Sequence, residues 1–127
     1  MIITDLLDYL IAGLNPEDPN QSSEESPEEV YVGMEAPEQL TNYVIIDQTG
    51  SDRTNHIITT RFAIQSYGAS LYDAIQLNEA VKAVMRGFYE KDDIVNVQLQ
   101  TDYNFTDTET KQYRWQAVYE ITHYEEE

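Results

Sequence analysis

Apolar residues recur with a helical period at two places along the chain. Over residues 2–13 they return every three or four positions with aspartates between them, which predicts a short amphipathic helix. A longer apolar stripe covers residues 70–89, and Ser70 precedes it with Asp73 three positions later. This spacing is typical of a capped helix start. We therefore expect a second, longer helix here.

Strand-like segments account for most of the remaining chain. β-branched and aromatic residues concentrate at 30–34, 42–48, 55–67, 94–101 and 113–124. Within the third of these segments, the positions 58, 60, 62 and 64 (Ile, Thr, Phe, Ile) share one face, and the positions 57, 59, 61, 63 and 65 (Ile, Thr, Arg, Ala, Gln) share a more polar one. This alternation predicts a strand with one face toward the core and one wetter face.

Turn signals order these segments into a sheet. Thr-Gly-Ser-Asp at 49–52 predicts a hairpin, and a long loop at 102–112 joins the last two strands into a second one. We expect the first three strands to be antiparallel neighbours. The chain is thus predicted to be a single α+β domain over residues 1–127. It has a twisted, mainly antiparallel sheet of four to five strands, a long helix packed on one face and a short N-terminal helix. Such a sheet leaves edges that invite pairing with another copy.

Charge and composition exclude several functions. The chain has 24 acidic and 7 basic residues, a net charge of −17, and all the basic residues follow position 52. Tight binding to nucleic acid phosphates or to anionic membranes needs a basic face, so neither is expected. The absence of cysteine excludes a disulfide scaffold, a cysteine nucleophile and a thiolate metal site. We expect no membrane span, because no apolar run approaches about 18 residues.

No catalytic or cofactor motif stands out. His56 and His123 lack the spacing of a metal site and are interpreted as surface or strand-end residues. The glycines do not cluster into a phosphate-binding loop. Pairs of acids are common by chance in so acidic a chain, and residues 102–109 lack the glycine and spacing of a calcium loop. We therefore expect no cofactor, no metal and no enzymatic activity.

The few basic residues are candidates for contacts between subunits, because on so acidic a surface a positive strand or helix face can meet the acidic part of another copy. An equally good interpretation is local neutralisation within one subunit. Residues 15–29, rich in acids, proline and serine, are likewise open to two interpretations: a solvated loop, or a segment that orders against a neighbouring subunit. The basic candidates are Arg53, Arg61, Lys82, Arg86 and Arg114.

Four stretches of the chain together resemble a known family. They are GMEAPEQ at 33–39, YVIIDQTG at 43–50, IITTRFAIQSYG at 57–68 followed by SLYDA at 70–74, and YRWQAVYEI at 113–121. In the order of their elements and in local sequence, residues 30–124 resemble the tail terminators and related head–tail joining proteins of long-tailed bacteriophages. The acidic segment at 15–29 has no counterpart in that resemblance.

The resemblance implies a structural protein of the virion tail, assembled in the host cytoplasm. Family members are small α+β domains that form a ring, typically a hexamer, on the head-proximal end of the tail tube. The ring stops tube polymerisation and joins the tail to the neck, and DNA passes through its channel. The implied partners are further copies of the chain, the tail tube protein and the neck or head-completion protein, with DNA only in transit and no membrane.

Some of the acids are expected to face such a channel, because acidic walls let DNA slide without holding its phosphates. Two segments are candidates for contact with the tube or the neck. The residues concerned are Asp102, Tyr103, Asn104, Phe105 and Lys111 in the loop 102–112, and Glu24 and Glu25 in the acidic segment.

Other functions remain open from the sequence. A different neck, head-completion or tail tube protein would share ring symmetry and a small fold. An acidic inhibitor that mimics DNA would suit the charge, although a proline-rich loop spaces its acids poorly for that purpose. An enzyme with a small polar substrate is the third alternative, and it lacks a nucleophile–base pair in the sequence.

Overall fold

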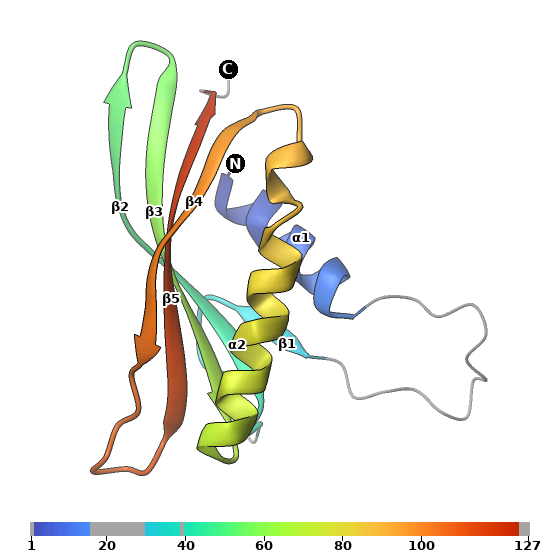
Figure 1. Ribbon diagram of the computed structural model, residues 1–127, viewed down its shortest axis with the longest axis vertical. Coiled ribbons are helices and arrows are strands. Elements are labelled where there is room, and N and C mark those ends of the chain that lie inside the picture. Colours follow the sequence, from blue (N-terminus) through green and yellow to red (C-terminus); the bar gives the residue numbers. More distant parts are fainter. Residues whose placement is uncertain (1, 16–29, 39, 125–127) are drawn as a thin grey trace, which may run out of the picture.

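A five-stranded sheet with both helices on one side forms the body of the protein (Figure 1). The computed structural model describes residues 2–15, 30–38 and 40–124. The α+β class, the mainly antiparallel sheet, the long helix on one face and the short N-terminal helix are all confirmed. The elements are α1 (Ile2–Leu14), β1 (Tyr31–Gly33), β2 (Tyr43–Thr54), β3 (Ile57–Gly68), α2 (Leu71–Met85), the 3-10 turn η1 (Phe88–Glu90), β4 (Ile94–Asn104) and β5 (Tyr113–Tyr124).

The strands lie in the order β1-β2-β3-β5-β4. β2 pairs antiparallel with β3, β3 with β5, and β5 with β4. The expectation that the first strand is also antiparallel is wrong, because β1 pairs with β2 in the parallel direction. The nine residues between them, which include Pro37, carry the chain back so that both strands run the same way.

The first hairpin turns later than the sequence predicts. β2 continues through residues 49–52 to Thr54, and the turn consists of Asn55 and His56. Asn55 has a φ of 59°, a left-handed conformation that asparagine tolerates better than most residues. Gly50 instead follows a β-bulge, in which Thr49 is the extra residue opposite β3.

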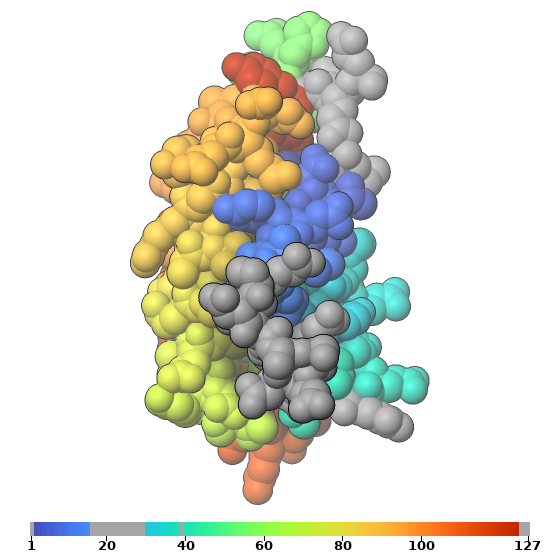
Figure 2. Space-filling view, turned by 90° about the vertical axis from the view of Figure 1, so that its right-hand side faces the viewer, coloured from blue at the N-terminus to red at the C-terminus, as the bar shows by residue number. Residues whose placement is uncertain are grey.

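The core lies between the sheet and the two helices. α2 begins at the predicted cap, since the Ser70 hydroxyl accepts a hydrogen bond of 3.1 Å from the Asp73 amide. It ends at Met85, earlier than predicted, and η1 follows with Phe88 fully buried. Figure 2 shows α1 and α2 side by side over this face. The even-numbered residues of β3, including Phe62, face this core as expected, and the odd-numbered ones form the opposite face.

The second hairpin also extends further than predicted. β4 reaches Asn104, so the first part of the expected loop 102–112 is strand. Tyr103 pairs with Gln116 across the hairpin, and a bridge between Asp107 and Gln112 narrows the loop that remains. None of the helices in the described residues is long and apolar enough to span a bilayer.

Candidate functional site

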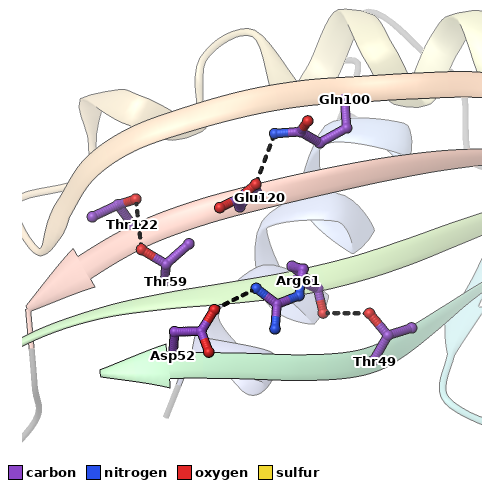
Figure 3. Close-up of polar contacts among 7 residues, drawn as sticks. All are labelled: Thr49, Asp52, Thr59, Arg61, Gln100, Glu120 and Thr122. Carbon is purple, nitrogen blue, oxygen red and sulfur yellow. Dashed lines mark hydrogen bonds and ion pairs between the residues drawn. The ribbon is translucent and has the colours of Figure 1, made fainter. Parts of the chain in front are cut away.

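The sheet face opposite the helices carries a row of polar side chains (Figure 3). The Arg61 guanidinium donates to the Asp52 carboxylate at 2.7 Å, and this contact raises the pKa of Arg61. On the neighbouring strands, Gln100 donates to Glu120 at 2.8 Å. Each of these charged groups is therefore met by a polar partner from the next strand, and the charges of Arg61 and Asp52 neutralise each other. We call this surface the open face.

An aromatic cluster occupies the end of the open face where β2 begins and β3 ends. The rings of Tyr43 and Tyr67 stack with their centroids 4.5 Å apart, and both are buried. The Arg114 guanidinium lies 4.5 Å from the centre of the Phe105 ring. It also donates to the Phe105 carbonyl at 2.7 Å and to the Tyr67 hydroxyl at 3.1 Å. Arg114 is thus held by its own chain.

A polar cluster under α2 joins the helix to the edge strand β4. The Asp102 carboxylate accepts hydrogen bonds from the Trp115 indole at 2.8 Å and, at 3.4 Å, from the buried Asn78 amide. The Lys82 ammonium lies 3.5 Å from Asp102 and 2.9 Å from Glu79. Its hydrogen bond to Glu79 is the main cause that raises the pKa of Lys82. We call these five residues the Asp102 cluster.

The five basic candidates do not form one patch. Arg61 and Arg114 lie on the open face, whereas Lys82 and Arg86 lie on the helix side. Arg53 lies near the tip of the β2–β3 hairpin, where it donates to the Asn55 carbonyl at 3.4 Å. Arg86 lines a shallow groove between α2 and β4 and has no ion-pair partner among the described residues. The interpretation as local neutralisation fits Arg61 and Lys82.

The predicted contact residues of the loop 102–112 are spread over strand and turn. Asp102 points under α2, and Tyr103 points to the open face, where its hydroxyl contacts Gln116. Asn104 ends β4 and accepts from the Thr106 amide at 3.0 Å. Phe105 belongs to the aromatic cluster, and Lys111 lies in the turn with a φ of 56°. Glu24 and Glu25 lie outside the described residues.

Two long strand edges have no partner among the described elements. β1 covers β2 only at Tyr43–Ile45, so the outer edge of β2 is unpaired over residues 46–54. β4 pairs with β5 on one side only, and its other side is an edge along all 11 residues. The sequence predicted that an edge must exist but not which strands would form it, because the strand order depends on long-range pairing. Five large apolar side chains that are partly exposed lie on or beside β4: Tyr89, Val95, Leu99, Tyr103 and Phe105.

No model of a known protein family matches the chain, and no curated protein matches it. The chemistry-bearing residues of the chain are dispersed: within the described ranges, no group of His, Asp and Glu is arranged to hold a metal ion. His123 is a strand-end residue, as expected, because it is the penultimate residue of β5; it is also buried, and its Nε2 lies 2.8 Å from the Thr60 hydroxyl. His56 lies exposed in the hairpin turn.

Proposed function

We propose that the chain is a structural subunit of a bacteriophage tail, as its resemblance to tail terminators suggests. Copies of it form a ring that caps the head-proximal end of the tail tube, stops tube polymerisation and joins the tail to the neck. The observation that carries this proposal is the pair of unpaired edges on opposite sides of one sheet. A contact between unlike edges is heterologous, and a heterologous contact that closes generates a ring.

The distribution of acids supports passage of DNA through such a ring. Asp5, Glu90, Asp92 and Asp93 surround one shallow depression at the end of the molecule where α1 begins and β4 starts, with Lys91 as the one base there. DNA phosphates are repelled by an anionic rim and held by a basic one. We assign this end of the subunit to the border of the channel. A ring whose channel is basic would contradict that assignment.

The proposed partners are the tail tube protein on one side of the ring and a neck protein on the other. The turn at 105–112, which projects beyond the ends of β4 and β5, is the described segment best placed to reach one of them (Figure 1). The proposed role is mechanical and includes no catalytic step.

Native mass spectrometry and electron microscopy of the purified chain test the proposal. We expect closed annular particles with a central channel. When the tail tube protein of the same phage genome is added, tube growth should stop at a capped end. A chain that stays monomeric at all concentrations, with tubes present or absent, contradicts the proposal. Self-assembly into long open tubes would indicate a tube subunit instead, and tight capture of a basic DNA-binding enzyme would indicate a DNA mimic.

A further inference from the structure

The two unpaired edges run in opposite directions. β2 is antiparallel to β3, β3 to β5 and β5 to β4, so β4 runs antiparallel to β2 across the sheet. In a ring every copy has the same orientation, and β4 of one copy then meets β2 of the next as an antiparallel pair. An antiparallel pair has the more stable of the two ladder geometries.

Both edges bulge next to the same row of the sheet. In β2 the extra residue is Thr49, next to the position opposite Phe62. In β4 the extra residues are Val95 and Gln100, and Gln100 is next to the position opposite Tyr119. Phe62 and Tyr119 are themselves paired, so Thr49 and Gln100 lie on either side of one row, whereas the bulge at Val95 has no counterpart in β2. Figure 3 shows Thr49 and Gln100 on the two outer strands of the drawn sheet.

A bulge bends its strand and increases its twist, which protects an edge against pairing with an arbitrary flat strand. An edge that bends at the same level escapes this protection, because its own bend follows that of its partner. The second copy of this chain supplies, on its opposite side, an edge that bends next to the same row. The bulges at Thr49 and Gln100 therefore favour a neighbour of the same kind over other strands.

The chemistry of the β4 edge also fits a contact with protein. In so acidic a chain, β4 contains no lysine, arginine or proline and has a single acid, Asp102, which is bonded inward to Trp115. Val95 and Leu99 are exposed there at 48% and 38%. On the β2 edge, Asp52 is neutralised by Arg61, and the other two charged residues, Asp47 and Arg53, have opposite signs. The cores of interfaces are depleted in charge in this way.

We propose that neighbouring copies join by strand addition, with β4 of one copy pairing antiparallel to residues 46–53 of β2 in the next, so that the rows of one sheet continue into the other. The pairing stops where β1 covers β2, so it joins residues 94–102 to residues 46–53. It continues the sheet from copy to copy and keeps every open face on the same side of the wall. This inference rests on the proposed assembly of copies and names the contact that makes it.

The register of the proposed contact follows from the rows of the sheet, that is, from the residues that are paired side by side across successive strands. Asn96 lies on the same row as Asp52, through the paired threonines Thr59 and Thr122. Thr101 and Asp47 share a second row in the same way, through Ala63 and Val118. When these rows continue from one copy to the next, Asn96 lies beside Asp52 of the next copy and Thr101 beside Asp47.

Disulfide cross-linking tests this register directly, because the chain has no cysteine of its own. Variants that each carry one cysteine are mixed in pairs under mild oxidation. We expect Asn96→Cys with Asp52→Cys to cross-link, because facing residues in a ladder lie within the reach of a disulfide. Asn96→Cys with Asp47→Cys should not, because these positions are about 13 Å apart along the strand at about 3.3 Å per residue.

Three controls keep the outcomes distinct. Ala80→Cys, exposed on the outer side of α2, should not cross-link with any edge variant. A disulfide in Asn96→Cys alone means that β4 pairs with a second β4 as a twofold dimer, which overturns the inference. Closed rings without the matched cross-link, or with the mismatched one, overturn it and leave the proposed ring standing. Absence of any assembly refutes the proposed function itself.

Discussion

The Asp102 cluster determines how firmly the edge strand β4 is attached to α2, so we expect substitution of Asp102 to weaken the fold. Asp102→Ala removes the acceptor for the Trp115 indole, which donates at 2.8 Å, and for the buried Asn78 amide at 3.4 Å. Lys82 keeps its shorter contact to Glu79 at 2.9 Å. The main loss is therefore the hydrogen bond from Trp115, together with two donors left without an acceptor.

The expected size follows from this inventory. A hydrogen bond to a charged group contributes about 1.5–3 kcal/mol, and a buried donor without a partner costs a similar amount. Because 24% of the Asp102 side-chain surface is exposed, water compensates part of that cost. We expect Asp102→Ala to lower the free energy of unfolding by about 2–3 kcal/mol. Asp102→Asn keeps an oxygen acceptor for the indole but loses the charge, so we expect a loss of about 1 kcal/mol.

Urea unfolding measures both losses, and Trp115 is a built-in probe because it is the only tryptophan of the chain. A double-mutant cycle with Trp115→Phe, followed by circular dichroism, isolates the hydrogen bond, since phenylalanine keeps much of the ring and lacks the N–H. We expect a coupling of about 1–2 kcal/mol between the two positions. A coupling near zero, or equal losses for the alanine and asparagine variants, would refute this reasoning.

Two further predictions concern pH and backbone packing. Burial, aided by the charge of Asp102, raises the pKa of Tyr119 to about 12. The unfolded chain releases this proton near pH 10 while the folded chain keeps it, so the free energy of unfolding should be unchanged below pH 10 and fall by about 2–3 kcal/mol by pH 12. Tyr119→Phe should reduce this fall, as measured by urea unfolding at each pH. At Gly68 an added Cβ would lie 2.5 Å from the Ala74 amide nitrogen, so Gly68→Ala should cost about 1–3 kcal/mol in thermal unfolding, whereas Gly50→Ala, which meets only the mobile end of Arg61, should be nearly neutral.

The local sequence pattern was enough to predict most of the helices and strands. It failed where the structure depends on pairing between strands that are distant in the sequence. Apolar periodicity and the Ser70 cap locate α2 and the alternating strands, because these features act within a few residues. The first hairpin was misplaced because glycine suits a bulge as well as a turn. Pairing of Arg53 with Ile58 on β3 draws the whole segment into the strand and moves the turn to Asn55.

The contacts of the candidate site could be predicted less well from the sequence. Whether Arg61 and Lys82 meet another copy or their own chain depends on Asp52 and Asp102, which become neighbours only through strand register and helix docking. The relative position of the bulges in β2 and β4 is still further from local signals, because it depends on the pairings of four strands at once. Composition does indicate the result in one respect: the segment that forms β4 is unusually poor in charge for this chain.

The contrast between the highly charged chain and the β4 edge, which is poor in charge, predicts how assembly should respond to salt. Each copy carries a net charge of −17, so copies repel one another over distances set by the Debye length, about 30 Å at 0.01 M salt and about 8 Å at 0.15 M. The proposed β4–β2 contact contains few charges, and two of the basic residues once considered for it, Arg61 and Lys82, are already neutralised within the subunit. Added salt therefore weakens the repulsion and leaves the contact intact. We expect rings to form at lower protein concentration in 0.5 M sodium chloride than in 0.02 M, as measured by sedimentation velocity. Rings that dissociate as salt is added would show that ion pairs between subunits hold them, contrary to this reasoning.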